Sequence, residues 1–246
     1  MFKDHFSAQS EGYAAFRPAY PEALFRYLAG LAPARQLAWD CATGTGQAAR
    51  SLAGYFERVI ATDASERQIA NAIAHPQVDY RIEPAEATDI GQGTLDLIVV
   101  AQALHWLDLD AFYREARRVL KPDGIIAVWC YDLLRIAPEV DAIIDHLYRD
   151  LVGEDWPAER RLVEDGYRSL PFPFDEIRPP SFAMSASWSL RQLAGYLRTW
   201  SAVVRFEQRS ARDPTGIIAK SLQAAWGEPD SRRRVEWPLA LRVGTY

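Results

Sequence analysis

The chain has 246 residues, of which 49% are hydrophobic and 25% are charged, and 28 basic against 33 acidic side chains give it a net charge of −5. Its length fits one large domain, and its composition excludes disordered, collagen-like and disulfide-scaffold proteins. The acidic balance argues against a nucleic-acid partner, which would need a basic surface. The first residues lack the apolar stretch of a signal peptide, and no run approaches the roughly 18 apolar residues of a membrane helix. We therefore expect a cytoplasmic protein that has no membrane partner.

Predicted strands and helices alternate along the first half of the chain. Apolar and β-branched runs predict strands at 36–41, 58–63, 78–83, 94–102 and 124–131. Amphipathic spacing and turn residues predict helices at 21–30, 47–56, 66–74 and 110–120. Ser65 with Gln68 forms a capping box for the third of these helices, and Asp110 is the predicted cap of the fourth. This alternation predicts βαβ units that build a parallel sheet.

The second half of the chain, from about residue 132, has a different pattern. Its predicted helices are separated by loops rich in proline and aromatic residues, and they span 138–152, 189–200 and 213–226. Two further strand candidates complete the sheet at 181–188 and 235–246, and Pro238 favours an edge or a bulge in the second. We predict one domain, residues 1–246, with a helical cap formed by about residues 1–30 and 132–230.

Two cysteines, Cys41 and Cys130, fall at the ends of two predicted strands. Two buried thiols in a reducing compartment are the expected state of these residues. The four histidines show no ligand spacing with the cysteines or with each other, so the sequence predicts no metal site.

A glycine loop, residues 42–46 (ATGTG), stands between the first strand and the second helix. Glycine lets the backbone turn tightly and approach a ligand, and the helix N-terminus offers N–H groups to it. The loop also satisfies the dinucleotide pattern G-x-G-x-x-A through Ala49, so an NAD(P)-dependent oxidoreductase is one alternative. Asp40 stands where the dinucleotide register needs an apolar side chain. An acid at this strand tip favours a cationic ligand such as a sulfonium.

Asp63 ends the next predicted strand. A carboxylate at that tip can accept both ribose hydroxyls of an adenosine, which fits S-adenosylmethionine and NAD alike. The alternative is that Asp63 only caps the following helix, a role that Ser65 already fills. We favour the ligand role.

With Asp40, Gly44, Gly46 and Asp63 in place, the chain resembles the class I S-adenosylmethionine-dependent methyltransferases, and among them the trans-aconitate methyltransferase-like small-molecule group. The strings that carry this resemblance in order are FSAQSEGYAAFRPAYP, LAWDCATGTGQAA, ATDASERQIANA, EPAEAT, LDLIVVAQALHW, RVLKPDGIIAVW and YLRTWSA. The resemblance implies a Rossmann-like α/β fold whose seven-stranded, mostly parallel sheet has the order 3-2-1-4-5-7-6, with strand 7 antiparallel. It implies methyl transfer from S-adenosylmethionine to a small molecule, such as a carboxylate oxygen, with S-adenosylhomocysteine as product and no metal. A non-catalytic cofactor-binding module is a further alternative.

The resemblance also implies which residues hold the cofactor. They are Asp40, Ala42, Thr43, Gly44, Gly46, Asp63, Ala64, Gln68, Ala85, Glu86 and Ala101. The sequence departs from the family pattern at two positions, because Ala42 replaces a glycine and Pro84 replaces an acid. Glu86 is then the candidate for the adenine amino group. Asp40 is as well suited to orient loop amides as to touch the ligand.

His105, just beyond the strand at 94–102, is the catalytic candidate. An ordinary pKa near 6.5 would let it remove a proton from a hydroxyl or hydrogen-bond an acceptor carboxylate. The alternative is that His105 and Trp106 pack under the cap. The candidates for substrate contact are Tyr13, Arg17, Gln102, Trp106 and Trp200. The sequence leaves open whether the protein is a monomer or a homodimer.

Overall fold

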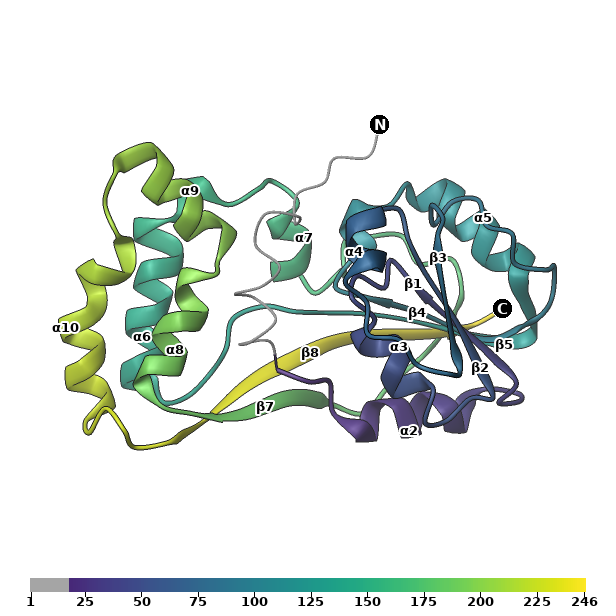
Figure 1. The fold of residues 1–246 in the computed structure, drawn as a ribbon, viewed down its shortest axis with the longest axis horizontal. Coiled ribbons are helices and arrows are strands. Elements are labelled where there is room, and N and C mark those ends of the chain that lie inside the picture. Colours follow the sequence, from purple (N-terminus) through teal and green to yellow (C-terminus); the bar gives the residue numbers. More distant parts are fainter. Residues whose placement is uncertain (1–17) are drawn as a thin grey trace.

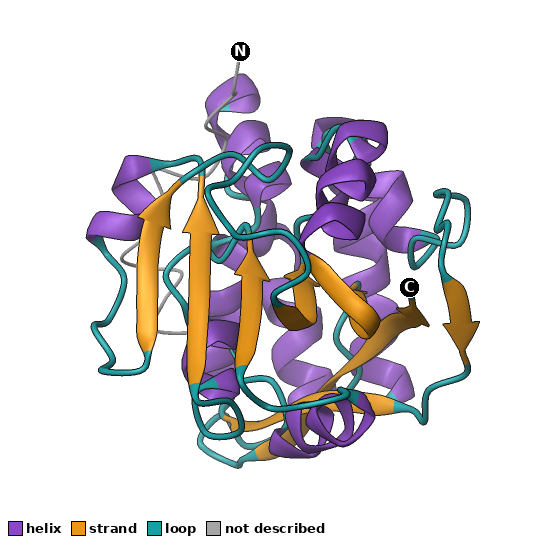
Figure 2. Cartoon of the chain, turned by 90° about the vertical axis from the view of Figure 1, so that its right-hand side faces the viewer, coloured by secondary structure: helices purple, strands orange, loops and turns teal. Residues whose placement is uncertain are grey.

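The computed structural model describes residues 18–246, so Tyr13 and Arg17, two of the candidates for substrate contact, lie outside the described residues. Its sheet begins with five parallel strands, which Figure 2 shows side by side. In chain order they are β1 (Leu37–Cys41), β2 (Arg58–Asp63), β3 (Val78–Ile82), β4 (Leu95–Ala101) and β5 (Leu120–Tyr131). All five confirm strands that the hydrophobic pattern predicts, and β4 is buried along nearly its whole length, as an apolar run requires.

The sheet is completed by a long antiparallel strand, β8 (Arg233–Thr245). One side of β8 pairs with β5, while its other side pairs with β6 (Asp175–Ile177) and β7 (Phe182–Trp188). The resulting order, β3-β2-β1-β4-β5-β8-β6 with β7 also on β8, confirms the predicted topology. The final strands carry higher numbers because the short strand β6 is additional, so that the strand predicted at 181–188 is β7 and the last strand is β8.

Pro238 lies at an irregularity of β8, as its sequence position predicts. Leu239 is paired with Tyr131, whereas Glu236 bridges to Arg135. The chain opposite β8 therefore holds one residue more than β8 does between these pairs, which is a β-bulge. A proline, which lacks a backbone N–H, fits a position where the ladder is interrupted.

Helices cover both faces of the parallel strands (Figures 1 and 2). The bounds of these helices are α2 (Glu22–Leu31), α3 (Gln47–Leu52), α4 (Glu66–Ala70) and α5 (Leu109–Val119). Two local predictions are corrected. The cap of α5 is Asp108 rather than Asp110, because the Asp108 carboxylate accepts the N–H of Ala111. Helix α2 packs against α3 and β5, so it belongs to the sheet layer and not to the cap.

The cap helices gather at the end of β7 and β8 that points away from the parallel strands (Figure 1). They are α6 (Pro138–His146), α8 (Leu190–Arg198), α9 (Ser201–Ser210) and α10 (Pro214–Trp226), with a π-helical turn at Leu147–Leu151 and a 3-10 turn at Gly153–Asp155. The short helix α7 (Arg160–Glu164) lies between this group and the sheet (Figure 1). Ser189 and Gln192 form the reciprocal capping box at the start of α8. The sequence did not predict α7, α9 or β6.

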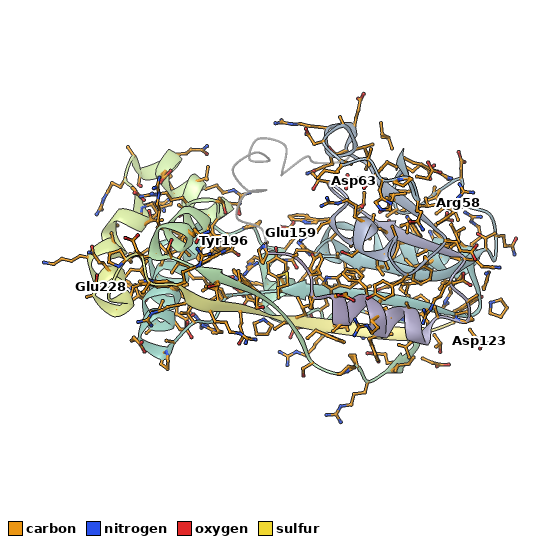
Figure 3. The ribbon with its side chains drawn as sticks, turned by 60° about the horizontal axis from the view of Figure 1, so that its bottom comes forward. Arg58, Asp63, Asp123, Glu159, Tyr196 and Glu228 are labelled. Carbon is orange, nitrogen blue, oxygen red and sulfur yellow. The ribbon has the colours of Figure 1, made fainter. Side chains whose placement is uncertain are left out.

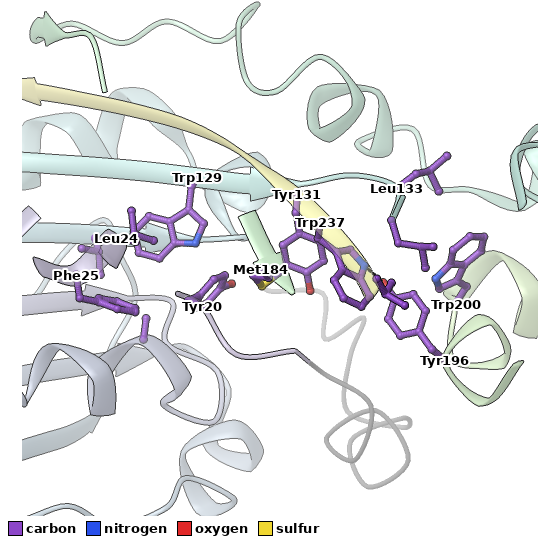
Figure 4. Packing of buried hydrophobic residues seen from close by; sticks show 14 of the residues in the cluster. Tyr20, Leu24, Phe25, Trp129, Tyr131, Leu133, Met184, Tyr196, Trp200 and Trp237 are labelled. Atoms are coloured by element: carbon purple, nitrogen blue, oxygen red, sulfur yellow. Dashed lines mark hydrogen bonds between the residues drawn. The ribbon is translucent and has the colours of Figure 1, made fainter. Parts of the chain in front are cut away.

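One hydrophobic core joins the cap to the sheet. Figure 4 shows Trp129, Tyr131 and Trp237 in a row along β5 and β8, with Phe25 at one end and Trp200 at the other. A second core fills the opposite face of the sheet, beneath α5, and it contains the buried free thiols of β1 and β5. Across residues 18–246 no helix has the length and apolar character needed to cross a membrane.

Asp96 on β4 anchors the amino-terminal edge of the sheet. Its side chain is fully buried, accepts the N–H groups of Gln36 and Leu37 at 2.9 and 3.0 Å, and pairs with Lys121 at 2.7 Å. We predict that Asp96→Ala lowers the free energy of unfolding by about 2–4 kcal/mol, because it leaves two amides without their acceptor and removes the ion pair of the partly exposed Lys121. Urea denaturation measures this.

Arg26→Ala is the control for this prediction. It breaks the exposed Arg26–Glu22 pair on α2 and is expected to change stability by at most about 0.5 kcal/mol. Equal losses in the two variants would contradict the anchoring role of Asp96.

Candidate functional site

The loop at residues 42–46 leaves β1 through three left-handed backbone positions. The φ angles are 54° at Ala42, 59° at Gly44 and 84° at Gly46. Glycine adopts this region without strain, whereas alanine does not. The alanine that replaces the first glycine of the family pattern therefore keeps the glycine-like backbone at a cost.

Asp40 organises this loop from below. Its side chain is 1% exposed, and one oxygen accepts the N–H of Ala49 at 2.8 Å and the hydroxyl of Thr43. The carboxylate thereby ties the loop to the first turn of α3. The structure thus shows the loop-orienting role, and contact with a ligand stays a prediction.

Asp63, at the carboxyl tip of β2, connects two neighbouring segments. One oxygen accepts the N–H of Gly44 and the other accepts the N–H of Ser65, both at 2.9 Å. Each carboxylate oxygen can accept a second hydrogen bond. Asp63 therefore orders the glycine loop and the start of α4, and its contact with ribose hydroxyls stays a prediction.

The two glycines of the loop border different surroundings. Among residues 18–246, a Cβ on Gly44 would meet only the Gln68 side chain, 4.0 Å away, so these residues leave space beside Gly44. A Cβ on Gly46 would lie 2.2 Å from the hydroxyl of Tyr80. Gly44 thus fits the close approach of a ligand, while Gly46 makes room for Tyr80 of β3.

The remaining cofactor candidates follow the tips of β2, β3 and β4. Ala64 is exposed, Ala85 is buried, and Ala101 ends β4. Glu86 accepts the N–H of Asp108 at 3.1 Å, so it also supports the start of α5. Contact of these residues with a cofactor stays a prediction.

Gln102 continues the pairing of β4 with β5 beyond the last strand residue. Its φ angle is 60°, its amide nitrogen donates to the carbonyl of Tyr131 at 3.0 Å, and its amide oxygen accepts the N–H of Tyr131 at 2.9 Å. The side chain thus replaces backbone bonds that the turn removes. This engagement favours a structural role over substrate contact.

His105 lies in a 3-10 turn, Leu104–Trp106, directly after Gln102. Its Nδ1 atom is 2.7 Å from the hydroxyl of Tyr167. The imidazole is tilted relative to the Trp106 ring, and the two ring centres are 4.7 Å apart. Burial, with a contribution from the charge of Arg160, lowers the pKa of His105 to about 4. The imidazole is therefore neutral at pH 7 and a weak base.

Arg160 is a site residue that sequence reasoning missed. The guanidinium donates to the Tyr148 hydroxyl at 2.6 Å, pairs with Asp132, and lies 5.0 Å from the Trp156 ring centre. Its charge acts on both His105 and Cys130, so it reaches the carboxyl ends of β4 and β5. Figure 3 shows the neighbouring Glu159 between Asp63 of the sheet and Tyr196 of the cap.

Trp200 belongs to the aromatic cluster beside this arginine. Its ring is 8% exposed and makes edge contacts with Tyr148 and Tyr196 and a tilted contact with Trp156. The structure thus places Trp200 in the core of the cap, and substrate contact stays a prediction. In the described part of the chain no group of three or more His, Cys, Asp or Glu side chains is arranged to hold a metal ion.

Comparison with known proteins identifies the family. The family described as a methyltransferase domain matches residues 39–128. A Dictyostelium discoideum protein named as a methyltransferase is 34% identical over 233 residues, which cover 93% of this chain and 89% of that protein. A Saccharomyces cerevisiae protein named as an S-adenosylmethionine-dependent methyltransferase is 28% identical over 132 residues, which cover 50% of this chain and 45% of that protein.

A solved structure from Anaeromyxobacter dehalogenans, described as a type II methyltransferase, is 49% identical to this chain, with a TM-score of 0.90. The match covers 93% of this chain and 97% of that one. The chain therefore belongs to the methyltransferase family, with the Rossmann-like fold of the class I S-adenosylmethionine-dependent enzymes. This membership decides against the oxidoreductase alternative.

Gly46→Ala should disturb the loop through packing as well as backbone strain. Left-handed φ costs a non-glycine residue roughly 1–2 kcal/mol, and overpacking adds about 1–3 kcal/mol. Tyr80 would have to move and release its bond to the Ile73 carbonyl. We predict a loss of about 2–4 kcal/mol in the free energy of unfolding, measured by urea denaturation.

The double variant Gly46→Ala/Tyr80→Ala tests the packing part of this prediction. A positive coupling of about 0.5–3 kcal/mol is expected, because the second change removes the clash. Gly30→Ala at an exposed position of helix α2, where a Cβ meets no described atom within 4 Å, is the control and should not destabilise. Strict additivity of the two losses would show that Tyr80 does not restrict Gly46.

Proposed function

We propose that the protein is an S-adenosylmethionine-dependent methyltransferase of the trans-aconitate methyltransferase-like group that methylates a carboxylate oxygen of a small molecule. The observation that carries the acceptor part is a largely buried cation, Arg160, whose charge acts on a histidine that is neutral at pH 7. Small-molecule substrates, without a nucleic-acid or membrane partner, are part of this proposal.

The residues present fit S-adenosylmethionine. The open space beside Gly44, bounded by Gln68, suits the close approach of a ligand to the loop backbone. Asp63, at the carboxyl tip of β2 beside the glycine loop, would hold the ribose hydroxyls, and the buried Ala85 would lie against the adenine. When bound, S-adenosylmethionine supplies an electrophilic methyl group that passes to the acceptor oxygen and leaves S-adenosylhomocysteine.

The charges near His105 favour an acceptor that is already ionised. A hydroxyl acceptor needs a base, and an imidazole with a pKa of about 4 is a poor one at pH 7. A carboxylate needs no base, and an arginine fork binds it well. Asp132 shares Arg160 in the present arrangement but is 37% exposed, so it is able to turn to solvent when a substrate carboxylate binds.

The chain's own groups would therefore orient the acceptor and exclude water. Arg160 would hold one oxygen of the substrate carboxylate, and the aromatic rings of Tyr148 and Trp156 keep that cation fixed. Enclosure between cap and sheet would align the oxygen for displacement, which is what methyl transfer chiefly requires.

Asp63→Ala should weaken cofactor binding. Loss of hydrogen bonds to a charged group, each worth about 1.5–3 kcal/mol, predicts at least a tenfold higher dissociation constant for S-adenosylhomocysteine by calorimetry. Asp79→Ala on β3, whose carboxylate pairs with Arg81, is the control. NADH should give no heat of binding in the same calorimetric titration. An unchanged constant in Asp63→Ala would leave Asp63 as a loop and helix cap only.

The acceptor class is tested with S-adenosylmethionine labelled in its methyl group and a panel of small carboxylic acids, phenols and amines. A carboxylate ester releases labelled methanol in base, which distinguishes it from ethers and methylamines. Turnover confined to phenols or amines, or absent from the whole panel, would contradict the proposal.

Arg160→Gln is the matching variant. With the best acid of the panel we expect KM to rise at least tenfold, because one charge-assisted contact of about 1.5–3 kcal/mol is lost. Removal of the positive charge should also raise the pKa of His105 above about 4. Arg161→Gln, an exposed arginine on the same helix, is the control. An unchanged KM would remove Arg160 from the acceptor site.

A further inference from the structure

Tyr167 lies directly behind His105, although the two residues are 62 positions apart in the chain. Its side chain is fully buried, and its hydroxyl is 2.7 Å from Nδ1 of the imidazole. Among residues 18–246 no side chain or backbone group is hydrogen-bonded to Nε2, the other ring nitrogen. The ring is therefore held through Nδ1.

The turn that carries Tyr167 is strained and held in place by β8. Gly166 and Tyr167 have φ angles of 65° and 62°, a left-handed conformation that is unfavourable for a residue such as tyrosine. A Cβ on Gly166 would lie 2.9 Å from Cβ of Ala240. The carbonyl of Tyr167 accepts a hydrogen bond from Arg242 at 2.8 Å. These contacts fix the position of the Tyr167 side chain.

The direction of the Tyr167–His105 hydrogen bond follows from the burial of the phenol. Burial raises the pKa of Tyr167 well above its usual range, so the hydroxyl keeps its proton. Within residues 18–246, the one acceptor atom hydrogen-bonded to this hydroxyl is Nδ1 of His105, at 2.7 Å. A buried hydroxyl without an acceptor is costly, so the phenol donates its proton to Nδ1, and a neutral imidazole then carries its own proton on Nε2.

We propose that Tyr167 is a positioning residue that fixes His105 with its proton on Nε2, so that His105 meets the methyl acceptor as a hydrogen-bond donor. The identity of that acceptor rests on the proposed function, whereas the state of the imidazole does not. His105 donates to one oxygen of the acceptor carboxylate and leaves the other oxygen to receive the methyl group. Burial, with a smaller contribution from the charge of Arg160, keeps the ring neutral.

The tautomer is measurable by two-bond ¹H–¹⁵N NMR on the full chain labelled with ¹⁵N-histidine. The chain has four histidines, and the spectrum of His105→Gln assigns the signals of His105. At pH 7 we expect His105 to show a protonated Nε2 and an unprotonated, hydrogen-bonded Nδ1. A proton on Nδ1, an even mixture of the two tautomers, or a charged ring would overturn the proposal, even if Tyr167→Phe failed to fold.

Tyr167→Phe tests whether the phenol sets that state. We expect the Nδ1 resonance of His105 to move and the second tautomer to appear, while the affinity for S-adenosylhomocysteine stays within twofold. Tyr113→Phe, which removes a similar buried hydroxyl bonded to the Pro171 carbonyl, is the control and should leave the His105 signals in place. Unchanged signals in Tyr167→Phe would overturn the positioning role.

The two proposals fail in different ways. Absence of S-adenosylhomocysteine binding, or labelled methyl transfer confined to phenols or amines, would count against the proposed function and leave the NMR result standing. Unchanged signals of His75 and His146 in Tyr167→Phe confirm that the variant is folded. A wild-type tautomer with its proton on Nδ1 would refute the Tyr167 proposal even if carboxylate methylation is found.

Discussion

The carboxyl edge of the parallel sheet is held by side chains that replace the backbone hydrogen bonds lost where the strands end. A buried N–H group without an acceptor is costly, so a strand cannot simply stop under a cap. Asp40 and Asp63 accept amides of the glycine loop and of the helix starts, and Gln102 supplies both a donor and an acceptor to Tyr131. The polar groups available to a ligand at this edge depend on that replacement.

This requirement explains why left-handed backbone positions cluster at the site. Ala42 leaves β1 and Gln102 leaves β4 with positive φ angles, and both turns are followed by a short helical segment. Such turns direct N–H groups and side chains towards the space above the sheet rather than along it. The backbone strain is tolerated because hydrogen bonds to the surrounding carboxylates and with the Gln102 amide hold these turns in place.

The cap is connected to the sheet by continuous packing as well as by the chain. Trp237 on β8 donates to the Tyr196 hydroxyl at 3.2 Å and packs edge-on against Trp188. Further along the row, the Tyr20 ring packs edge-on against Trp129. Rings of this size bury much apolar area and interlock in few ways. Helix α7 is held from both sides, because Val163 packs in the second core and Arg160 lies over the rings of Tyr148 and Trp156.

Local patterns in the sequence determined the strands, the glycine loop and the Ser189–Gln192 capping box, because hydrophobic periodicity and caps act over a few residues. The choice between Asp108 and Asp110 as the cap of α5 was not local, since it depends on where the 3-10 turn after β4 ends. Only the tertiary structure brought Arg160 and Tyr167 to His105. These residues are more than fifty positions away in the chain, and the surrounding PFPF and RRL segments resemble ordinary loops and solvated helix. A charge or a phenol changes the chemistry of a histidine through distance and burial, and neither of these quantities is present in a linear pattern.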